Sequence, residues 1–238
     1  MISMKTEIAV VAAGPAGLAA AITAAENNKK VIIFEKSNIC GGAANMGMGP
    51  LGIDTRIQRS NFNEISVGDA YNKHMEYTHY RVNGPLVSRY FRMSADTIDW
   101  LMEMGVEFAG AFRYSRDSEA TWHIVKTPSG IGPRCAGAMM KIMTERALEL
   151  GVDICTETPV YDLIQDSEGR VVGVRAKDRN GEEIECEADA VVVATGGFGT
   201  NAEMMKEEYP RIPFYMVPGN CDRYRCAPDT PEILIWKV

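Results

Sequence analysis

The sequence predicts an α/β fold with a mainly parallel sheet, and three apolar runs carry that prediction. Residues 8–11 and 31–34 are apolar, and an alanine-rich stretch that begins with a glycine-containing turn separates them. Two buried strands joined by a helix form a βαβ unit, in which the strands lie parallel. The third run, at 190–194, has no polar residue. Such a run is typical of a strand at the centre of a parallel sheet.

The turn after the first strand predicts a dinucleotide site. Gly14 and Gly17 occupy the second and third glycine positions of the G-x-G-x-x-G fingerprint. Gly14 lets the backbone approach a pyrophosphate, and Gly17 lets the helix pack closely on the strand. The helix N-terminus offers free N–H groups to the phosphates. Glu35, at the end of the second strand, is placed to accept hydrogen bonds from ribose hydroxyls.

The fingerprint departs from its pattern at one position. Ala12 stands where the first glycine normally makes the tight turn, so we expect backbone strain there. An ordinary βαβ unit with a glycine-rich turn is the alternative interpretation. The strand, helix, second strand and terminal acid all lie in register, which favours the dinucleotide site.

Bulk composition argues against several classes of protein. The chain has 238 residues, of which 46% are hydrophobic and 24% charged, as is ordinary for a globular protein. A net charge of −7 and the lack of a basic cluster argue against a nucleic-acid partner. No apolar run reaches membrane-spanning length, so we expect no direct membrane insertion.

Cysteine usage favours a reduced protein without a metal site. The six cysteines are scattered and form no C-x-x-C pair, which supports neither a zinc nor an iron–sulfur site. Glu7 before the first apolar run and Gly-Pro after it argue against a secretory signal. We therefore expect a cytoplasmic location.

Periodicity predicts the remaining elements in order along the chain. Helical patterns occur at 63–80, 85–104 and 134–150. The methionines of the last helix are interpreted as core packing. Residues 106–125 predict a hairpin, and 152–155 a short strand. Alternating patterns predict a small antiparallel sheet from segments at 160–164, 171–176 and 184–188.

Two further glycine-rich segments follow predicted strand ends. Residues 41–49 read GGAANMGMG, and residues 195–199 read TGGFG. Glycine lets a loop lie flat against a ligand, and ligands bind at the carboxyl ends of parallel strands. Both segments are therefore expected to line the ligand.

Taken in order, these segments resemble a known family. They are GPAGLAAA, Glu-Lys followed by Gly-Gly, a helix followed by Gly-Val-Asp, Gly-Arg-Val-Val-Gly-Val, and Ala-Thr-Gly-Gly-Phe-Gly-x-Asn. From residue 5 to about 209 the chain resembles the FAD-binding flavoproteins of the fumarate reductase and succinate dehydrogenase type. The resemblance implies a Rossmann-like FAD-binding domain at 1–220, with a parallel sheet and a small antiparallel β insertion. Its Rossmann parts are expected at about 5–50 and 134–209, with a helical and hairpin insertion at about 55–130.

The resemblance also implies where FAD binds. It places the pyrophosphate at the first turn, the adenosine ribose at Glu35, the adenine beside Val160 and the isoalloxazine towards residues 43–46. The cofactor-binding residues implied are Ala13, Gly14, Pro15, Ala16, Gly17, Glu35, Lys36, Gly41, Gly42, Ala43, Ala44, Asn45, Val160, Ala194, Thr195 and Gly196. Members with covalent FAD carry a histidine in the loop after the second strand. This loop has none, so we expect noncovalent FAD.

The implied activity is that of an FAD-dependent oxidoreductase. Hydride would pass between the flavin and an activated carbon–carbon double bond of a small molecule such as an unsaturated acid, with an electron-transfer partner. No catalytic residue is assigned, because the capping domain of the family is expected to be absent. The tail at 221–238 does not resemble the Thr-Gly-Asp-Gly segment of the family, and a frameshift is one explanation. The alternatives are a truncated, noncatalytic FAD-binding module and an NAD-binding dehydrogenase, since Glu35 suits either ribose.

Few side chains outside these motifs are candidates for facing a substrate. His123 precedes the helix predicted at 134–150 and is a candidate for contact with substrate or flavin, although a lone histidine is more often structural. His74 and His79 lie on a predicted helix and are more simply structural or surface residues. Three arginines could face an anionic substrate or solvent: Arg113, Arg116 and Arg134.

Overall fold

The computed structural model describes residues 1–199 and 201–209. The chain divides into two compact units, Met1–Ala194 and Thr195–Val238, and each is described by itself. The tail at 221–238 lies outside the described residues. The domain boundaries given above stay predictions.

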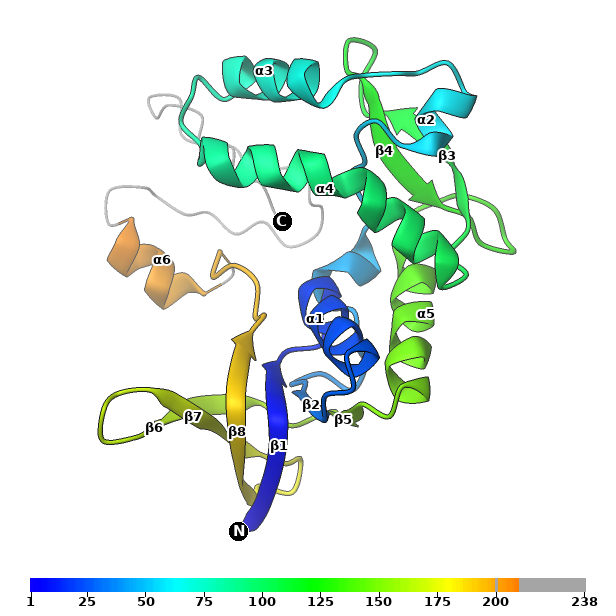
Figure 1. Cartoon of the computed structure of the whole chain (residues 1–238). Coiled ribbons are helices and arrows are strands. Elements are labelled where there is room, and N and C mark those ends of the chain that lie inside the picture. The colour runs from blue at the N-terminus through cyan, green and yellow to red at the C-terminus, as the bar shows by residue number, and fades with distance from the viewer. Residues whose placement is uncertain (200, 210–238) are drawn as a thin grey trace. The chain divides into compact units, whose positions relative to one another are not determined.

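The first unit is built on a six-stranded sheet with the strand order β5-β2-β1-β8-β7-β6 (Figure 1). Its strands are β1 (Ile2–Val11), β2 (Val31–Phe34), β5 (Asp153–Cys155), β6 (Val160–Gln165), β7 (Val171–Lys177) and β8 (Glu183–Val193). The strands β5, β2, β1 and β8 run parallel, whereas β7 and β6 are added antiparallel. β1 lies between β2 and β8, so the chain leaves β1 towards one neighbour and later returns on its other side. The carboxyl ends at such a point form the crevice in which α/β proteins bind ligands.

The predicted α/β class, with its parallel sheet and antiparallel insertion, is confirmed. One detail differs, because the segments expected as separate strands at 184–188 and 190–194 form the single strand β8. β1 begins at Ile2, well before the apolar run, and pairs in parallel with β8 from Ile2–Ile184 to Val11–Val193. This long partner carries β8 straight through Asp189, which the sequence pattern treats as a break.

Alternate residues of the parallel strands face two different apolar clusters. Val10 and Ile33 pack on one face together with residues of α1 (Pro15–Glu26) and α5 (Ala136–Glu149). Ala9 and Phe34 pack on the opposite face against residues of β7 and β8. Both faces of β1 and β2 are therefore buried, which explains why their sequences are continuous apolar runs.

The insertion between the Rossmann parts contains three helices and a hairpin. These elements are α2 (Arg56–Ser60), α3 (Val67–Tyr77), α4 (Gly84–Glu103), β3 (Phe108–Arg113) and β4 (Ala120–Val125). The expected helices and hairpin are present, whereas the short helix α2 was not expected as an element. A separate apolar cluster that includes Ile53, Ile65 and Phe91 fills the insertion.

The second unit contains the helix α6 (Ala202–Glu208) among its described residues. The side chain of Asn201 caps this helix by accepting hydrogen bonds from the amides of Glu203 and Met204, each 3.1 Å long. Asn is a favoured N-cap residue because its side-chain oxygen satisfies amides that lack a helical partner.

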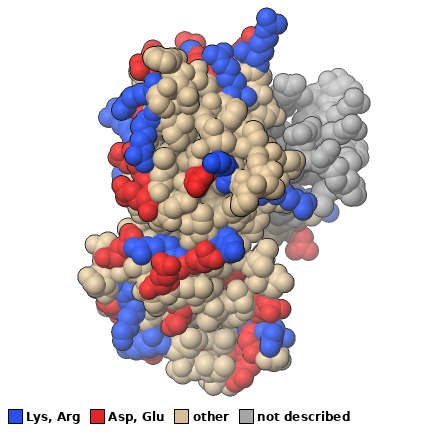
Figure 2. Space-filling view, turned by 90° about the vertical axis from the view of Figure 1, so that its right-hand side faces the viewer, with Lys and Arg blue, Asp and Glu red and all other residues tan. Residues whose placement is uncertain are grey.

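Charged side chains are mixed by sign on the surface in view. Figure 2 shows Lys and Arg interspersed with Asp and Glu on the face that it presents. Within residues 1–199 and 201–209, no helix combines the length and apolar character needed to cross a bilayer. Cys40, Cys135, Cys155 and Cys186 are free thiols, and the described residues contain no cluster of side chains suited to a metal ion.

Candidate cofactor-binding site

The turn from β1 to α1 presents the uncapped N-terminus of a helix. Gly14 is the N-cap residue and Pro15 begins α1, and no side chain in the described ranges caps the helix. The first turn of α1 contains no acidic residue. A Cβ atom placed on Gly14 would meet nothing within 4 Å, so the space in front of the turn is open. Free amides and the positive end of the helix dipole make this space suitable for a phosphate.

Gly17 allows α1 to approach β1 more closely than any other residue would. A Cβ atom on Gly17 would lie 1.9 Å from the carbonyl oxygen of Ala12 and 3.3 Å from Cγ1 of Val10. No side chain fits in that space, because real Cβ contacts to backbone atoms are essentially never shorter than 3.0 Å. The close helix–strand approach expected from the fingerprint is therefore present.

Ala12 has the backbone strain expected from its place in the fingerprint. Its φ angle is +81°, in the left-handed region that favours glycine. The residue is fixed there, because its amide donates a 2.8 Å hydrogen bond to the carbonyl of Phe34 in β2. A left-handed alanine costs on the order of 1 kcal/mol in the folded state. A glycine at this position removes that strain, but it also gives the unfolded chain more conformational entropy, which offsets part of the gain in stability.

We therefore expect Ala12→Gly to raise the free energy of unfolding by about 0.5 kcal/mol. Urea denaturation of the two proteins measures the difference. Ala13→Gly is the matched control, because Ala13 is fully buried and its φ is not positive, so that change should destabilise the chain. A loss of stability in Ala12→Gly would contradict the strain at this position.

Glu35 is a buried carboxylate that braces the turn. Its side chain is only 4% exposed. Oε2 accepts a 2.7 Å hydrogen bond from the amide of Ala13, and Oε1 accepts a 2.8 Å hydrogen bond from the amide of Ser37. Each oxygen of an ionised carboxylate can accept two hydrogen bonds, so both retain capacity for a ribose hydroxyl. Glu35 thus joins the β1–α1 turn to the start of the next loop.

The loop after β2 folds back onto the β1–α1 turn. The amide of Gly41 donates a 2.7 Å hydrogen bond to the carbonyl of Ala13. Gly42 opens the short 3-10 helix η1 (Gly42–Met46), and a Cβ atom on Gly42 would lie 3.5 Å from Cα of Gly14. Two glycine segments from different parts of the chain therefore face each other. Asn45 holds this loop by donating from Nδ2 to the carbonyl of Cys40 at 2.8 Å.

The other residues predicted to bind the cofactor lie at several places around the β1–α1 turn and beyond it. The amide of Ala194 donates a 2.9 Å hydrogen bond to Val11, which places Ala194 beside the β1–α1 turn. Val160 begins β6. The backbone amide of Thr158, two residues earlier, donates a 2.8 Å hydrogen bond to the carbonyl of Glu35. Pro15, Ala16, Lys36 and Ala43 are exposed around the same turn and loop, and Ala44 is half-buried. Thr195 and Gly196 belong to the second unit.

The residues gathered at this edge of the sheet fit a dinucleotide such as FAD. Gly14 and Gly42 leave room for backbone approach, the N-terminus of α1 offers amides to a pyrophosphate, and Glu35 offers acceptors to a ribose. This geometry by itself does not distinguish FAD from NAD, because both contain an adenosine ribose and a pyrophosphate.

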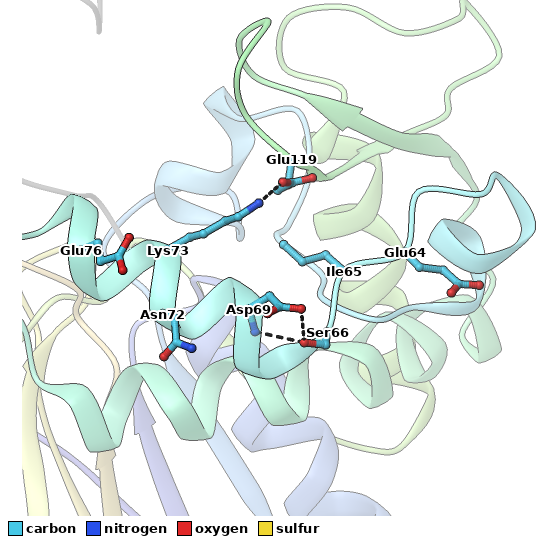
Figure 3. Close-up of a pocket in the computed structure, with 8 residues that line it drawn as sticks. All are labelled: Glu64, Ile65, Ser66, Asp69, Asn72, Lys73, Glu76 and Glu119. Carbon is cyan, nitrogen blue, oxygen red and sulfur yellow. Dashed lines mark hydrogen bonds and ion pairs between the residues drawn. The ribbon is translucent and has the colours of Figure 1, made fainter.

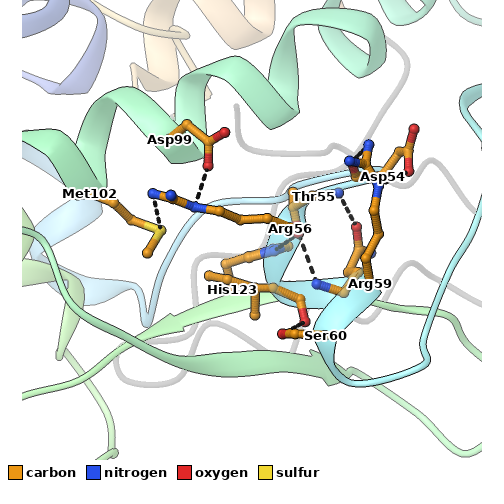
Figure 4. Close-up of polar contacts among 10 residues, drawn as sticks. Asp54, Thr55, Arg56, Arg59, Ser60, Asp99, Met102 and His123 are labelled. Atoms are coloured by element: carbon orange, nitrogen blue, oxygen red, sulfur yellow. Dashed lines mark hydrogen bonds and ion pairs between the residues drawn. The ribbon is translucent and has the colours of Figure 1, made fainter.

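His123 does not have the accessibility expected of a substrate-binding residue. Its side chain is fully buried, and Nδ1 lies 3.1 Å from the carbonyl oxygen of Thr121. Nε2 lies 2.8 Å from Oγ1 of Thr55, and both of these residues are drawn in Figure 4. A carbonyl can only accept, so Nδ1 carries the proton and Nε2 accepts from the Thr55 hydroxyl. His74 packs edge-on against Phe91 of α4.

Burial gives the stability of the chain a pH dependence. Desolvation lowers the pKa of both His123 and His74 below that of an exposed histidine. The unfolded chain then binds more protons than the folded chain, so the free energy of unfolding falls as pH drops from 7.5 towards 5.5. Urea midpoints measured across this range should decrease, and His123→Gln should flatten the slope. His79→Gln, at an exposed position, is the control. A flat wild-type profile would contradict this expectation.

The arginines considered as substrate ligands are all exposed. Arg113 ends β3, Arg116 follows it, and Arg134 precedes α5 with a φ angle of +69°. A relation of these residues to a substrate stays a prediction.

A surface hollow at α3 is a poor alternative site for a dinucleotide. It has a volume of about 470 Å³ and is shown in Figure 3. Its lining residues are Glu64, Ile65, Ser66, Asp69, Asn72, Lys73, Glu76 and Glu119. Lys73 is its only cation and is paired with Glu119. The remaining carboxylates would repel a pyrophosphate.

Comparison with known proteins identifies the family of the chain. Residues 7–220 match the family model described as FAD binding domain. A vinyl phenol reductase of Lactiplantibacillus plantarum is 33% identical over 202 residues, covering 84% of this chain and 40% of that protein. An NADH:fumarate oxidoreductase of Klebsiella pneumoniae is 30% identical over 209 residues, covering 87% of this chain and 22% of that protein.

The structural comparison agrees with the sequence comparison. The open conformation of a flavocytochrome c3 fumarate reductase superposes with a TM-score of 0.79 at 25% identity, covering 88% of this chain and 36% of that chain. The chain therefore spans less than half the length of these relatives. On the match over residues 7–220, the chain belongs to the FAD binding domain family and its cofactor is FAD.

Proposed function

We propose that this chain is the FAD-binding part of a reductase that acts on an activated carbon–carbon double bond. The relatives support this proposal through their names, which identify a vinyl phenol and fumarate as substrates. In both molecules the double bond is conjugated with a further π system. The proposed class of substrate is therefore a small molecule with a conjugated carbon–carbon double bond, such as an unsaturated acid.

The observation that carries the proposal is the juxtaposition of Gly14, Gly42 and Glu35 around the uncapped start of α1. When bound, FAD supplies hydride transfer, and the protein supplies binding and orientation. The amides at the start of α1 hold the pyrophosphate, and Glu35 orients the ribose. Residues 36–50 contain no histidine, which supports noncovalent attachment.

The proposed function includes an electron donor and a cellular location. An electron-transfer partner is proposed because a reductase needs a source of electrons. A cytoplasmic location is proposed from the scattered cysteines, and four of them are free thiols in the described residues.

A noncatalytic FAD-binding module is the alternative function. One observation favours it: His123, the histidine candidate for contact with substrate, is buried and has both ring nitrogens occupied. The described residues therefore provide a cofactor site without an identified proton donor. An NAD-binding dehydrogenase is disfavoured by the match to FAD-binding proteins.

Reoxidation of reduced flavin tests the proposal. The chain is loaded with FAD, reduced anaerobically with dithionite and mixed with fumarate or a vinyl phenol, with succinate as the saturated control. A reductase should recover the absorbance of oxidised flavin with an alkene but not with succinate. Stable binding of FAD without reoxidation by either alkene would favour the noncatalytic module.

A further inference from the structure

The segment that follows η1 runs alongside β4 of the hairpin of the insertion and pairs with it at an isolated bridge. The amides of Val125 and His123 donate to the carbonyls of Met48 and Pro50, each at 2.9 Å. The amide of Gly52 donates to the carbonyl of Thr121, also at 2.9 Å, and Leu51 pairs antiparallel with Trp122. Residues 48–52 are therefore fixed to β4 by backbone hydrogen bonds at alternate positions, as in an antiparallel ladder.

Two glycines in this segment are required by close contact with His123. A Cβ atom on Gly49 would lie 1.8 Å from the carbonyl oxygen of His123. A Cβ atom on Gly52 would lie 2.6 Å from Cε1 of the His123 ring. The loop after η1 and β4 thus fit together without room for a side chain between them.

A buried polar network also connects β4 to the residues that follow this segment. Thr55 is 1% exposed, and its hydroxyl bridges Nε2 of His123 at 2.8 Å and the amide of Gln58 at 3.2 Å. Gln58 is fully buried and donates from Nε2 to the carbonyl of Ala120 at 2.8 Å. Every member is paired, and a fully satisfied buried network rigidifies its surroundings.

The same segment is tied to the helix α4. The amide of Ile53 donates to Oγ of Ser94 at 2.9 Å. Arg56 forms a 2.9 Å ion pair with Asp99 (Figure 4). At its other end the loop meets α5, where the amide of Ala136 donates to the carbonyl of Gly47 at 3.2 Å. The continuous segment of residues 41–56 thus joins the β1–α1 turn to α5, β4 and α4.

We propose that β4, His123 and Thr55 position the cofactor loop, so that FAD binding at residues 41–45 rigidifies the hairpin of the insertion. His123 and Thr55 are positioning residues, because they act on the cofactor only through residues 47–52. This inference rests on the binding of FAD at the β1–α1 turn.

Hydrogen exchange of the wild-type chain, measured with and without FAD, tests the coupling directly. Added FAD should slow exchange at the amides of Gly52, His123 and Val125, which join the loop to β4. The amides of residues 163–165 of β6, which pair with β7 and do not include Val160, are the internal control and should not change. Flavin absorbance measured on the same sample reports binding independently of exchange.

A pair of threonine variants tests the network. Thr55→Val removes the hydroxyl and should raise the Kd for FAD by about tenfold. Thr55→Ser keeps the hydroxyl and should bind nearly as the wild type does. Thr97→Val is the matched control, because the Thr97 hydroxyl is exposed and donates only to the carbonyl of Met93 within α4.

The outcomes separate the inference from the function on which it rests. Binding of FAD without slower exchange in β4, or equal affinity of Thr55→Val and wild type, would overturn the coupling alone. Failure of the wild-type chain to bind FAD would overturn both the cofactor site and the coupling. If Thr55→Val does not fold, the exchange measurement on the wild type and the FAD affinity of Thr55→Ser still test the coupling.

Discussion

Replacing Gly17 with alanine is expected to lower the free energy of unfolding by about 3 kcal/mol or more. The added methyl group would lie 1.9 Å from the carbonyl oxygen of Ala12, so α1 must move away from β1. That movement would disturb the cluster that includes Val10 and Leu18. Urea denaturation followed by far-UV circular dichroism measures the loss, and FAD binding should disappear with the fold.

Gly14→Ala is the matched substitution, three residues earlier in the same turn. A Cβ atom there meets nothing within 4 Å, and φ is −72°, which alanine adopts freely. The stability should change by less than about 1 kcal/mol, since alanine is only a poorer N-cap. The methyl group would instead occupy the space for the pyrophosphate, so FAD affinity should fall by about tenfold or more. Equal effects of the two variants on stability would contradict the assignment of separate packing and binding roles.

Replacing Glu35 with glutamine is expected to reduce both stability and FAD binding. Oε1 and Oε2 accept hydrogen bonds from the amides of Ser37 and Ala13, and an amide NH₂ in either place would oppose a donor. Leaving one buried donor unpaired should lower the free energy of unfolding by about 1–3 kcal/mol. Loss of the ribose acceptor should weaken FAD binding by about tenfold to hundredfold. Urea denaturation and a fluorescence titration with FAD measure the two effects.

Glu26→Gln is the control for that substitution. Glu26 ends α1 and forms a partly exposed ion pair with Arg146, so its loss should change stability by less than about 1 kcal/mol and leave FAD binding unchanged. If Glu35→Gln behaved like Glu26→Gln, the role of Glu35 in bracing the turn would be wrong.

The core of the site could be predicted from local sequence because local backbone geometry determines it. Gly17, Ala12 and Glu35 lie within one βαβ unit, and the spacing of that unit fixes where each one falls. The positive φ of Ala12 follows from its position in the turn, where the fingerprint normally has a glycine. The close contact at Gly17 follows from helix–strand packing. Val160 has no such local signal, and its contact with the adenine is expected only from the family resemblance.

The structure differs from the sequence-based expectation where distant segments pair. The single strand β8 depends on pairing with β1 over residues that carry no apolar pattern, such as Ser3 and Lys5. The short helix α2 had a readable signal, since Thr55 and Gln58 form a T-x-x-Q capping box. The contact between Thr55 and His123 spans 68 residues, so no local pattern predicts it.

The most direct test of the central claim is the visible absorption spectrum of the purified chain after addition of FAD and gel filtration. The account predicts an equimolar flavin that stays with the protein and is released by acid precipitation, as expected for tight noncovalent binding. A chain that is folded by circular dichroism but retains no flavin would contradict the assignment of Gly14, Gly42 and Glu35 as a sufficient FAD site.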